Sequence, residues 1–149
     1  MSMNVKATEQ VAILGAIAPS SQAAGAATTG WISMAAFNKA LAVIQSGALG
    51  TSATIDAKLQ QATNSAGAGA KDIAGKAITQ LTGAPGANVQ VEINLDAQEL
   101  DVANGFSFVQ LSVTVGTAAS GTAALLFGFV PRFAPASDSN ATTVAQIVG

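Results

Sequence analysis

Three carboxylates lie close together in the sequence, at Asp96, Glu99 and Asp101, and they are the strongest candidates for chemistry in the chain. Grouped carboxylates can supply oxygen ligands to Ca²⁺ or act as the acid and base of glycoside cleavage. Calcium takes about six to eight oxygen ligands, however, and the spacing of Asp96 and Glu99 matches a helix capping box. We therefore predict that these two residues cap a helical turn, and that the chain has no metal site and no catalytic pair.

The composition removes most other reactive groups. The 149 residues include no histidine and no cysteine, the side chains that perform most proton transfer, nucleophilic attack and zinc binding near neutral pH. No P-loop, dinucleotide-binding, HExxH or GxSxG motif is present. The six basic residues are scattered singly, so no basic patch is available for nucleic acid. The sequence predicts a protein that is not an enzyme, needs no cofactor and binds no nucleic acid.

Charge is scarce and apolar residues are abundant. Charged residues make up 9% of the chain and apolar residues 50%, whereas an ordinary soluble domain is about 25% charged. Much of the surface is therefore expected to contact other protein molecules. The chain has no uninterrupted apolar run of about 18 residues, so a membrane span is not predicted. The short run at 11–18 resembles the apolar part of a secretory signal, but Glu9 precedes it, and we predict a buried strand there.

Apolar and polar residues alternate in the segments 54–60, 89–96 and 107–115. This period of two predicts antiparallel strands with one face in the core and one in water. A second group of segments is apolar on both faces: 11–18, 31–37, 41–44 and 123–130. Such runs suit central strands, or strands whose outer face meets a neighbouring subunit. Phe127 and Phe129 are expected in the core.

Turn-forming residues separate these segments, and the Ala-rich stretches 22–28 and 66–70 are expected to be loops because glycines interrupt them. Strands of this length and spacing predict an all-β fold, an antiparallel β-sandwich of jelly-roll type. We expect one domain over residues 1–149, with extended arms at the N- and C-termini.

The segment 131–149 is predicted to be the C-terminal arm, since two prolines and a polar run do not support an interior strand. Its single arginine is suited to bidentate pairing with a carboxylate of a neighbour. Its last residues include an apolar cluster that is expected to pack on another subunit. Together with the aromatic residues, this arm supplies the candidate interface residues: Trp31, Phe37, Phe106, Phe108, Arg132, Phe133, Val144, Ile147 and Val148.

Three segments resemble small virion structural proteins of tailed bacteriophages, particularly head decoration (capsid cement) proteins. They are ATIDAKLQ at 53–60, the strand-turn-strand pattern at 89–115, and LLFGFVPRFAPAS at 125–137. The resemblance implies a non-catalytic homotrimer, made in the host cytoplasm, on the outer surface of the capsid. It implies that the protein stabilises the shell by bridging subunits of the major capsid protein.

Two alternatives remain open from the sequence. A tail or head-tail connector protein would form rings of about six or twelve subunits in place of trimers. A carbohydrate-binding β-sandwich module would expose Trp31 in a groove, because sugars stack on aromatic rings.

Overall fold

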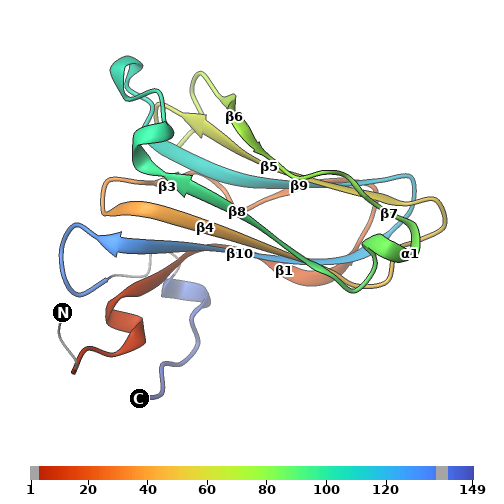
Figure 1. Cartoon of the computed structure of the whole chain (residues 1–149), viewed down its shortest axis with the longest axis horizontal. Helices are drawn as coiled ribbons and strands as arrows, with labels where there is room; N and C mark the ends of the chain where they lie inside the picture. The colour runs from red at the N-terminus through yellow and green to blue at the C-terminus, as the bar shows by residue number, and fades with distance from the viewer. Residues whose placement is uncertain (1–3, 137–140) are drawn as a thin grey trace.

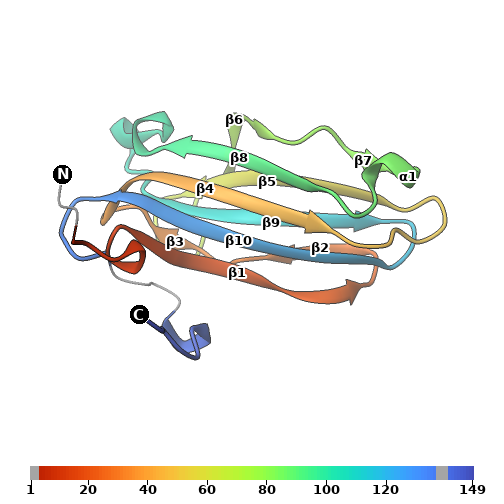
Figure 2. The same cartoon turned by 60° about the horizontal axis from the view of Figure 1, so that its bottom comes forward.

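The computed structural model describes residues 4–136 and 141–149, and its strands form two antiparallel sheets packed face to face (Figure 1). The first sheet has the order β1-β10-β4-β8, formed by Val11–Gln22, Ser120–Pro131, Phe37–Ser46 and Gln90–Asp96 (Figure 2). The second has the order β2-β9-β5-β6, formed by Gly25–Thr28, Phe108–Gly116, Thr54–Ala62 and Lys71–Ala77. Two short strands extend it, β3 (Ile32–Ser33) beside β9 and β7 (Leu81–Thr82) beside β5.

The helical elements are single turns: η1 (Ala7–Glu9), α1 (Gly83–Gly86), η2 (Ala97–Glu99), η3 (Val102–Asn104) and η4 (Ala141–Thr143). Among the described residues, none of these is long and apolar enough to cross a membrane.

The strand pairs are nested in the sequence. β1 pairs with β10, β2 with β9, β4 with β8, and β5 with β6, each pair antiparallel. A long hairpin wound into two facing sheets produces this order, which is the jelly roll. The prediction of an all-β antiparallel sandwich of jelly-roll type is confirmed. β1, which could have paired with a neighbouring molecule, completes its own sheet beside β10.

The core lies between the sheets and is formed by the inward-facing residues of each strand. Every second residue of β5 and β9 is buried, including Ile55, Leu59, Leu111 and Val113, while their neighbours in the sequence face outward. β8 shows the same alternation. The period-two prediction is therefore correct for all three segments.

Two expectations about the strands are wrong, those for the segments 31–37 and 22–28. The segment 31–37 is not one strand, because a turn at 35–36 separates β3, which pairs with β9, from β4, which begins at Phe37 in the other sheet. The Ala-rich residues 25–28 form β2, which pairs with β9; Gly25 lies at the first position of this strand and so does not interrupt it. The strand expected at 11–18 is present as β1, and its place at the sheet edge excludes the alternative of a central strand. Pro19 is tolerated there because no ladder donor is needed at an edge. The stretch 66–70 is a loop, as expected.

Phe37 is a core residue, which corrects its prediction as an interface residue. Its ring is 1% exposed and lies below Gly128, where an added Cβ would come within 2.7 Å of the ring. Phe127 and Phe129 flank Gly128 in β10 and have the opposite orientation, so they are half-buried on the outer face and not in the core. A strand that is apolar on both faces does not reveal which face is inward; the fit of Phe37 against Gly128 determines it.

Candidate functional site

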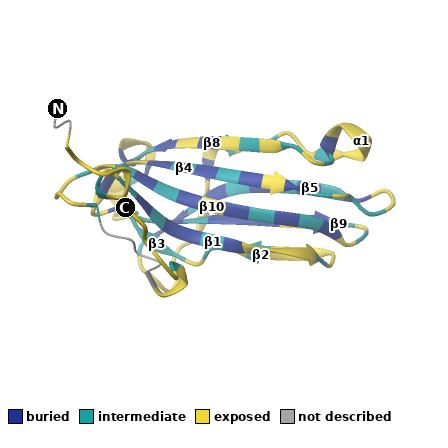
Figure 3. Cartoon of the chain, turned by 90° about the horizontal axis from the view of Figure 1, so that it is seen from below, coloured by how far each residue is buried: buried dark blue, intermediate teal, exposed yellow. Residues whose placement is uncertain are grey.

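The outer face of the first sheet is apolar where β1, β10 and β4 lie side by side. The register brings Ile13, Phe127 and Leu41 into one row, and Ala16, Leu125 and Val43 into the next. We call this surface the apolar face; it consists of Val11, Ile13, Ala16, Leu41, Val43, Ala123, Leu125, Phe127 and Phe129. Figure 3 shows these three strands mainly in the colours of buried and intermediate residues, whereas alternate residues of β8 and the last part of β1, at 18–21, are exposed.

The apolar face follows from the sequence of its strands. β1 and β10 contain no charged residue, and β4 contains only Lys39. In a strand, alternate side chains point to opposite faces of the sheet. A strand that is apolar throughout therefore places one set of apolar side chains in the core and a second set on the outer face. On this sheet the outer apolar faces of three neighbouring strands coincide. Leu125 is exposed and the other eight residues are half-buried, and apolar side chains gathered on a surface in this way suit an interaction with another molecule.

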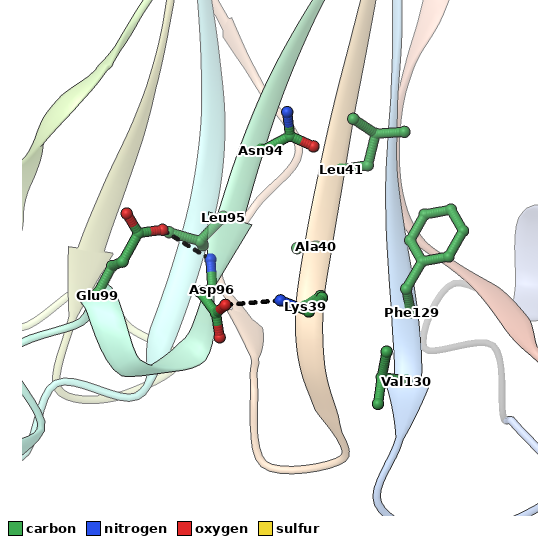
Figure 4. Close-up of a pocket in the computed structure, with 9 residues that line it drawn as sticks. All are labelled: Lys39, Ala40, Leu41, Asn94, Leu95, Asp96, Glu99, Phe129 and Val130. Carbon is green, nitrogen blue, oxygen red and sulfur yellow. Dashed lines mark hydrogen bonds and ion pairs between the residues drawn. The ribbon is translucent and has the colours of Figure 1, made fainter.

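Two shallow hollows lie on this side of the sheet. One has a volume of about 430 Å³ and lies between β1, β10 and β4, lined by apolar residues that include Ala16, Pro19, Leu125 and Phe127. The other, about 480 Å³, lies at the opposite end of β10 and β4 (Figure 4). Apolar and polar groups share its lining: Lys39, Ala40, Leu41, Asn94, Leu95, Asp96, Glu99, Phe129 and Val130. The apolar face thus has a polar border along β8.

The outer face of the second sheet is polar, in contrast to the apolar face. Gln60 donates to Asp72 at 2.9 Å and accepts from Gln110 at 3.0 Å, and Lys58 pairs with the same Asp72 at 3.0 Å. Hydrogen bonds from Gln60 first, and from Lys58 second, lower the pKa of Asp72. This network satisfies side chains that face water. The two broad surfaces of the molecule therefore differ in chemistry, one apolar and one hydrated.

The three carboxylates singled out in the sequence each pair with a different lysine. Asp96 accepts from Lys39 at 2.7 Å, Asp101 from Lys71 at 2.6 Å, and Glu99 lies 3.0 Å from the Lys76 ammonium. Glu99 also accepts from the Asp96 N–H at 2.8 Å, the reciprocal bond of the capping box, which confirms that prediction. Within the described ranges, no group of acidic residues is arranged to hold a metal ion. These carboxylates hold loops and strand ends in place.

These contacts lower the pKa values of all three carboxyls. For Asp96 the main cause is the hydrogen bond from Lys39. For Glu99 the hydrogen bond from the Asp96 N–H lowers the pKa most, followed by the one from Lys76. For Asp101 the hydrogen bond from Lys71 lowers the pKa most, followed by the one from Asn104. A carboxyl whose pKa is lowered in the folded state stabilises the fold when the pH is above the ordinary carboxyl pKa of about 4. This contribution is lost as the pH falls from that value through the lowered pKa of the folded state.

We therefore expect the urea concentration at the midpoint of unfolding to decrease when the pH is lowered from 6 to 3. A variant with Lys39, Lys71 and Lys76 all replaced by Met should show a smaller fall, because the cations that favour the ionised carboxyls are gone. Urea titrations followed by circular dichroism at both pH values measure this difference. An equal fall in the variant would contradict the assignment to these pairs.

Three of the predicted interface residues lie at one end of the second sheet. Trp31 is half-buried against the loop before β6, where a Cβ at Gly67 would fall on the indole nitrogen. Phe106 is half-buried beneath the Lys71 ammonium, which lies 4.1 Å from the ring centroid. Phe108 is half-buried at the start of β9. These rings pack against their own chain, and their role as interface residues remains a prediction.

The other predicted interface residues follow β10. Arg132 is exposed and its backbone N–H donates to the Ala36 carbonyl at 2.8 Å, which fixes the chain as it leaves the sheet. Phe133 is 78% exposed. Val144 is half-buried, whereas Ile147 and Val148 are exposed. None of these side chains belongs to the apolar face.

The sequence did not single out the residues of the apolar face by number. The sequence feature that indicated this face was the pair of segments at 11–18 and 123–130. Both are apolar on both faces, which suits strands whose outer face meets a neighbouring subunit. Within those segments, Leu125 and Phe127 were indistinguishable from core residues, because the inward face depends on packing between distant strands.

Comparisons with known proteins give structural matches alone. No family model matches the chain, and no curated protein does. Similar solved structures include a chain of the empty virus-like particle of cowpea mosaic virus, at 12% identity and a TM-score of 0.40, covering 74% of this chain and 55% of that one. A chain of Desmodium yellow mottle tymovirus matches at 9% identity and a TM-score of 0.40, and the match covers 92% of this chain and 97% of that one. A chain of Triatoma virus matches at 10% identity and a TM-score of 0.42, and the match covers 93% of this chain and 74% of that one. This chain thus spans about half of the cowpea mosaic virus chain, and at these scores the matches carry no inference about function.

Proposed function

We propose that this chain is a non-enzymatic structural protein of a virus particle, and that it decorates and stabilises the capsid by bridging subunits of the major capsid protein. The observation that carries the proposal is the apolar face, nine side chains from three adjacent strands on a chain with only 9% charged residues. Such a face is poorly suited to permanent contact with water. The resemblance of three sequence segments to phage decoration proteins supports the capsid as the partner.

The contrast between the two sheets gives the proposed orientation. The apolar face lies against the shell, and the polar outer face of β5, β9 and β6, with its Gln60, Asp72 and Lys58 network, points to solvent. The polar border at Lys39, Glu92 and Asp96 surrounds the contact on the β8 side. A dry apolar centre with a polar rim is the usual arrangement of a specific protein interface.

The chain termini extend the proposed contact. Both lie at the same end of the sandwich (Figure 1). Phe133, Ile147 and Val148 are exposed there, and Arg132 has a free guanidinium among the described residues. Several modest contacts made by one subunit on a lattice combine by avidity. In this proposal the apolar face supplies most of the binding energy and the arm reaches a neighbouring subunit.

Counting the copies of this chain on purified particles tests the proposal. Particles are banded by density from the culture that produces the protein, and the copy number is measured by quantitative mass spectrometry and by immunogold labelling. A decoration protein is expected at many copies over the head surface. Absence from the particles contradicts the proposal, and six or twelve copies at one vertex or on the tail favours the connector alternative. No observation favours a carbohydrate site, because Trp31 is half-buried.

A further inference from the structure

We infer that β8 is a pairing edge for a second copy of this chain, which adds its own β8 antiparallel across a two-fold axis centred on Ile93. This interface is separate from the apolar face, since it uses the backbone at the edge of the first sheet. The inference does not depend on which partner the apolar face takes.

The hydrogen-bond pattern shows which backbone groups of β8 are open. Ser46 N–H donates to the Val89 carbonyl at 2.9 Å, and Val89 N–H donates to the Ser46 hydroxyl at 3.1 Å, so both backbone groups of Val89 are turned toward β4. In an antiparallel ladder this direction alternates from one residue to the next, and therefore the odd-numbered residues of β8 are turned toward β4. The N–H and C=O groups of Gln90, Glu92 and Asn94 point away from the sheet. Asp96 fits this pattern, because its N–H points outward to Glu99.

The outward groups of Gln90, Glu92 and Asn94 have no hydrogen-bond partner within the part of the chain that the structure describes. All three residues are exposed, and β8 borders only β4 in its sheet (Figure 2). An open edge of this kind is a template for another strand.

The other sheet edges are blocked, and β8 is not. β1 carries Pro19 and two register shifts in its pairing with β10. β2 and the two-residue strands β3 and β7 are short, and β6 contains Gly75 with a φ of +74° and a register shift against β5. Proline, bulges and short length are how proteins protect edges from pairing. β8 has seven residues, unbroken register, no proline and no glycine.

The side chains of β8 make a second copy the matching partner. With Ile93 on the axis, Glu92 lies opposite Asn94 of the other copy, and Gln90 opposite Asp96. Each carboxylate then faces an amide that can donate to it, and no like charges are opposed. A register centred on Glu92 would place two carboxylates together. A register centred on Val91 would bring in Asn88, whose φ of +55° lies outside the strand region.

Disulfide trapping tests the register, and the absence of native cysteine makes it specific. The variants Glu92→Cys and Asn94→Cys are mixed under mild oxidation and the products are weighed by mass spectrometry. In the proposed register the mixed disulfide should exceed either homodisulfide by about ten-fold, because directly opposite residues lie about 5.5 Å apart at Cα, within disulfide range. The control mixture contains Gln45→Cys and Asn94→Cys, because Gln45 is exposed on β4 and lies away from the sheet edge.

A backbone variant provides the second measurement. Glu92→Pro removes an outward N–H without touching the bonds to β4, so the fold should be kept, as circular dichroism can verify. Because both copies lose a bond, the dissociation constant of the pair measured by analytical ultracentrifugation should rise by about ten-fold or more. Three results would each overturn the inference. The first is a mixed disulfide no more abundant than in the control, and the second is a dominant Glu92→Cys homodisulfide. The third is unchanged association of the Glu92→Pro variant.

Discussion

Replacing Phe37 with alanine is expected to lower the free energy of unfolding by about 3–5 kcal/mol. Phe37 heads the fully buried side chains by volume, and it fills the space that Gly128 leaves open on β10. Loss of the ring removes buried apolar area and leaves a cavity that the two sheets cannot close. Since domains of this kind are stable by about 5–15 kcal/mol, the variant should lose a large part of its stability. Urea unfolding followed by circular dichroism measures the change.

A double-mutant cycle identifies the contact responsible. Gly128→Ala alone is expected to cost about 1–3 kcal/mol, because its Cβ would come within 2.7 Å of the Phe37 ring. In a Phe37→Leu background this cost should shrink, since the smaller side chain leaves room for the added methyl group. An undiminished cost in the double variant would show that another contact limits residue 128.

Leu125→Asp is expected to weaken binding to capsids by about 30-fold or more. Leu125 lies in the middle of the apolar face and is 37% exposed, so its substitution should cost the isolated subunit little. In the proposed complex the new carboxylate would be buried without a partner, which is strongly unfavourable. The measurement is co-sedimentation of each variant with particles from the source culture that have been stripped of this chain.

Ala26→Asp is the matched control, because it adds the same carboxylate at an exposed position of β2, on the outer face of the second sheet. It should bind as the unmodified protein does. If Ala26→Asp abolished binding and Leu125→Asp did not, the proposed orientation would be reversed. Equal binding by all three proteins would remove the apolar face from the contact.

The fold was predictable wherever the sequence distinguishes the two faces of a strand. In β5, Ile55 and Leu59 alternate with Asp56 and Lys58, so only one orientation buries the apolar residues and leaves the charges in water. The capping box was predictable for a similar reason, because Asp96 and Glu99 are three residues apart and their interaction is local. Turn residues then limited the strand lengths.

The candidate site was not predictable at the level of residues. Phe127 and Phe37 are both apolar residues in apolar segments, and the sequence around each does not show that one faces outward and the other inward. The choice depends on the pairing of β10 with β1 and β4, strands about a hundred residues away in sequence. Aromatic type was a poor guide to the surface, since Phe37, predicted at an interface, lies in the core.

The nested strand pairing also determines when the apolar face can form. β10 lies between β1 and β4, so β1 has no ladder partner until Ser120–Pro131 has left the ribosome. Pairings between such distant segments form late and slowly. The apolar face is shared by β1, β10 and β4, and it therefore cannot form before β10 has paired with both of its neighbours. Incomplete chains lack this surface, and only finished chains can present it.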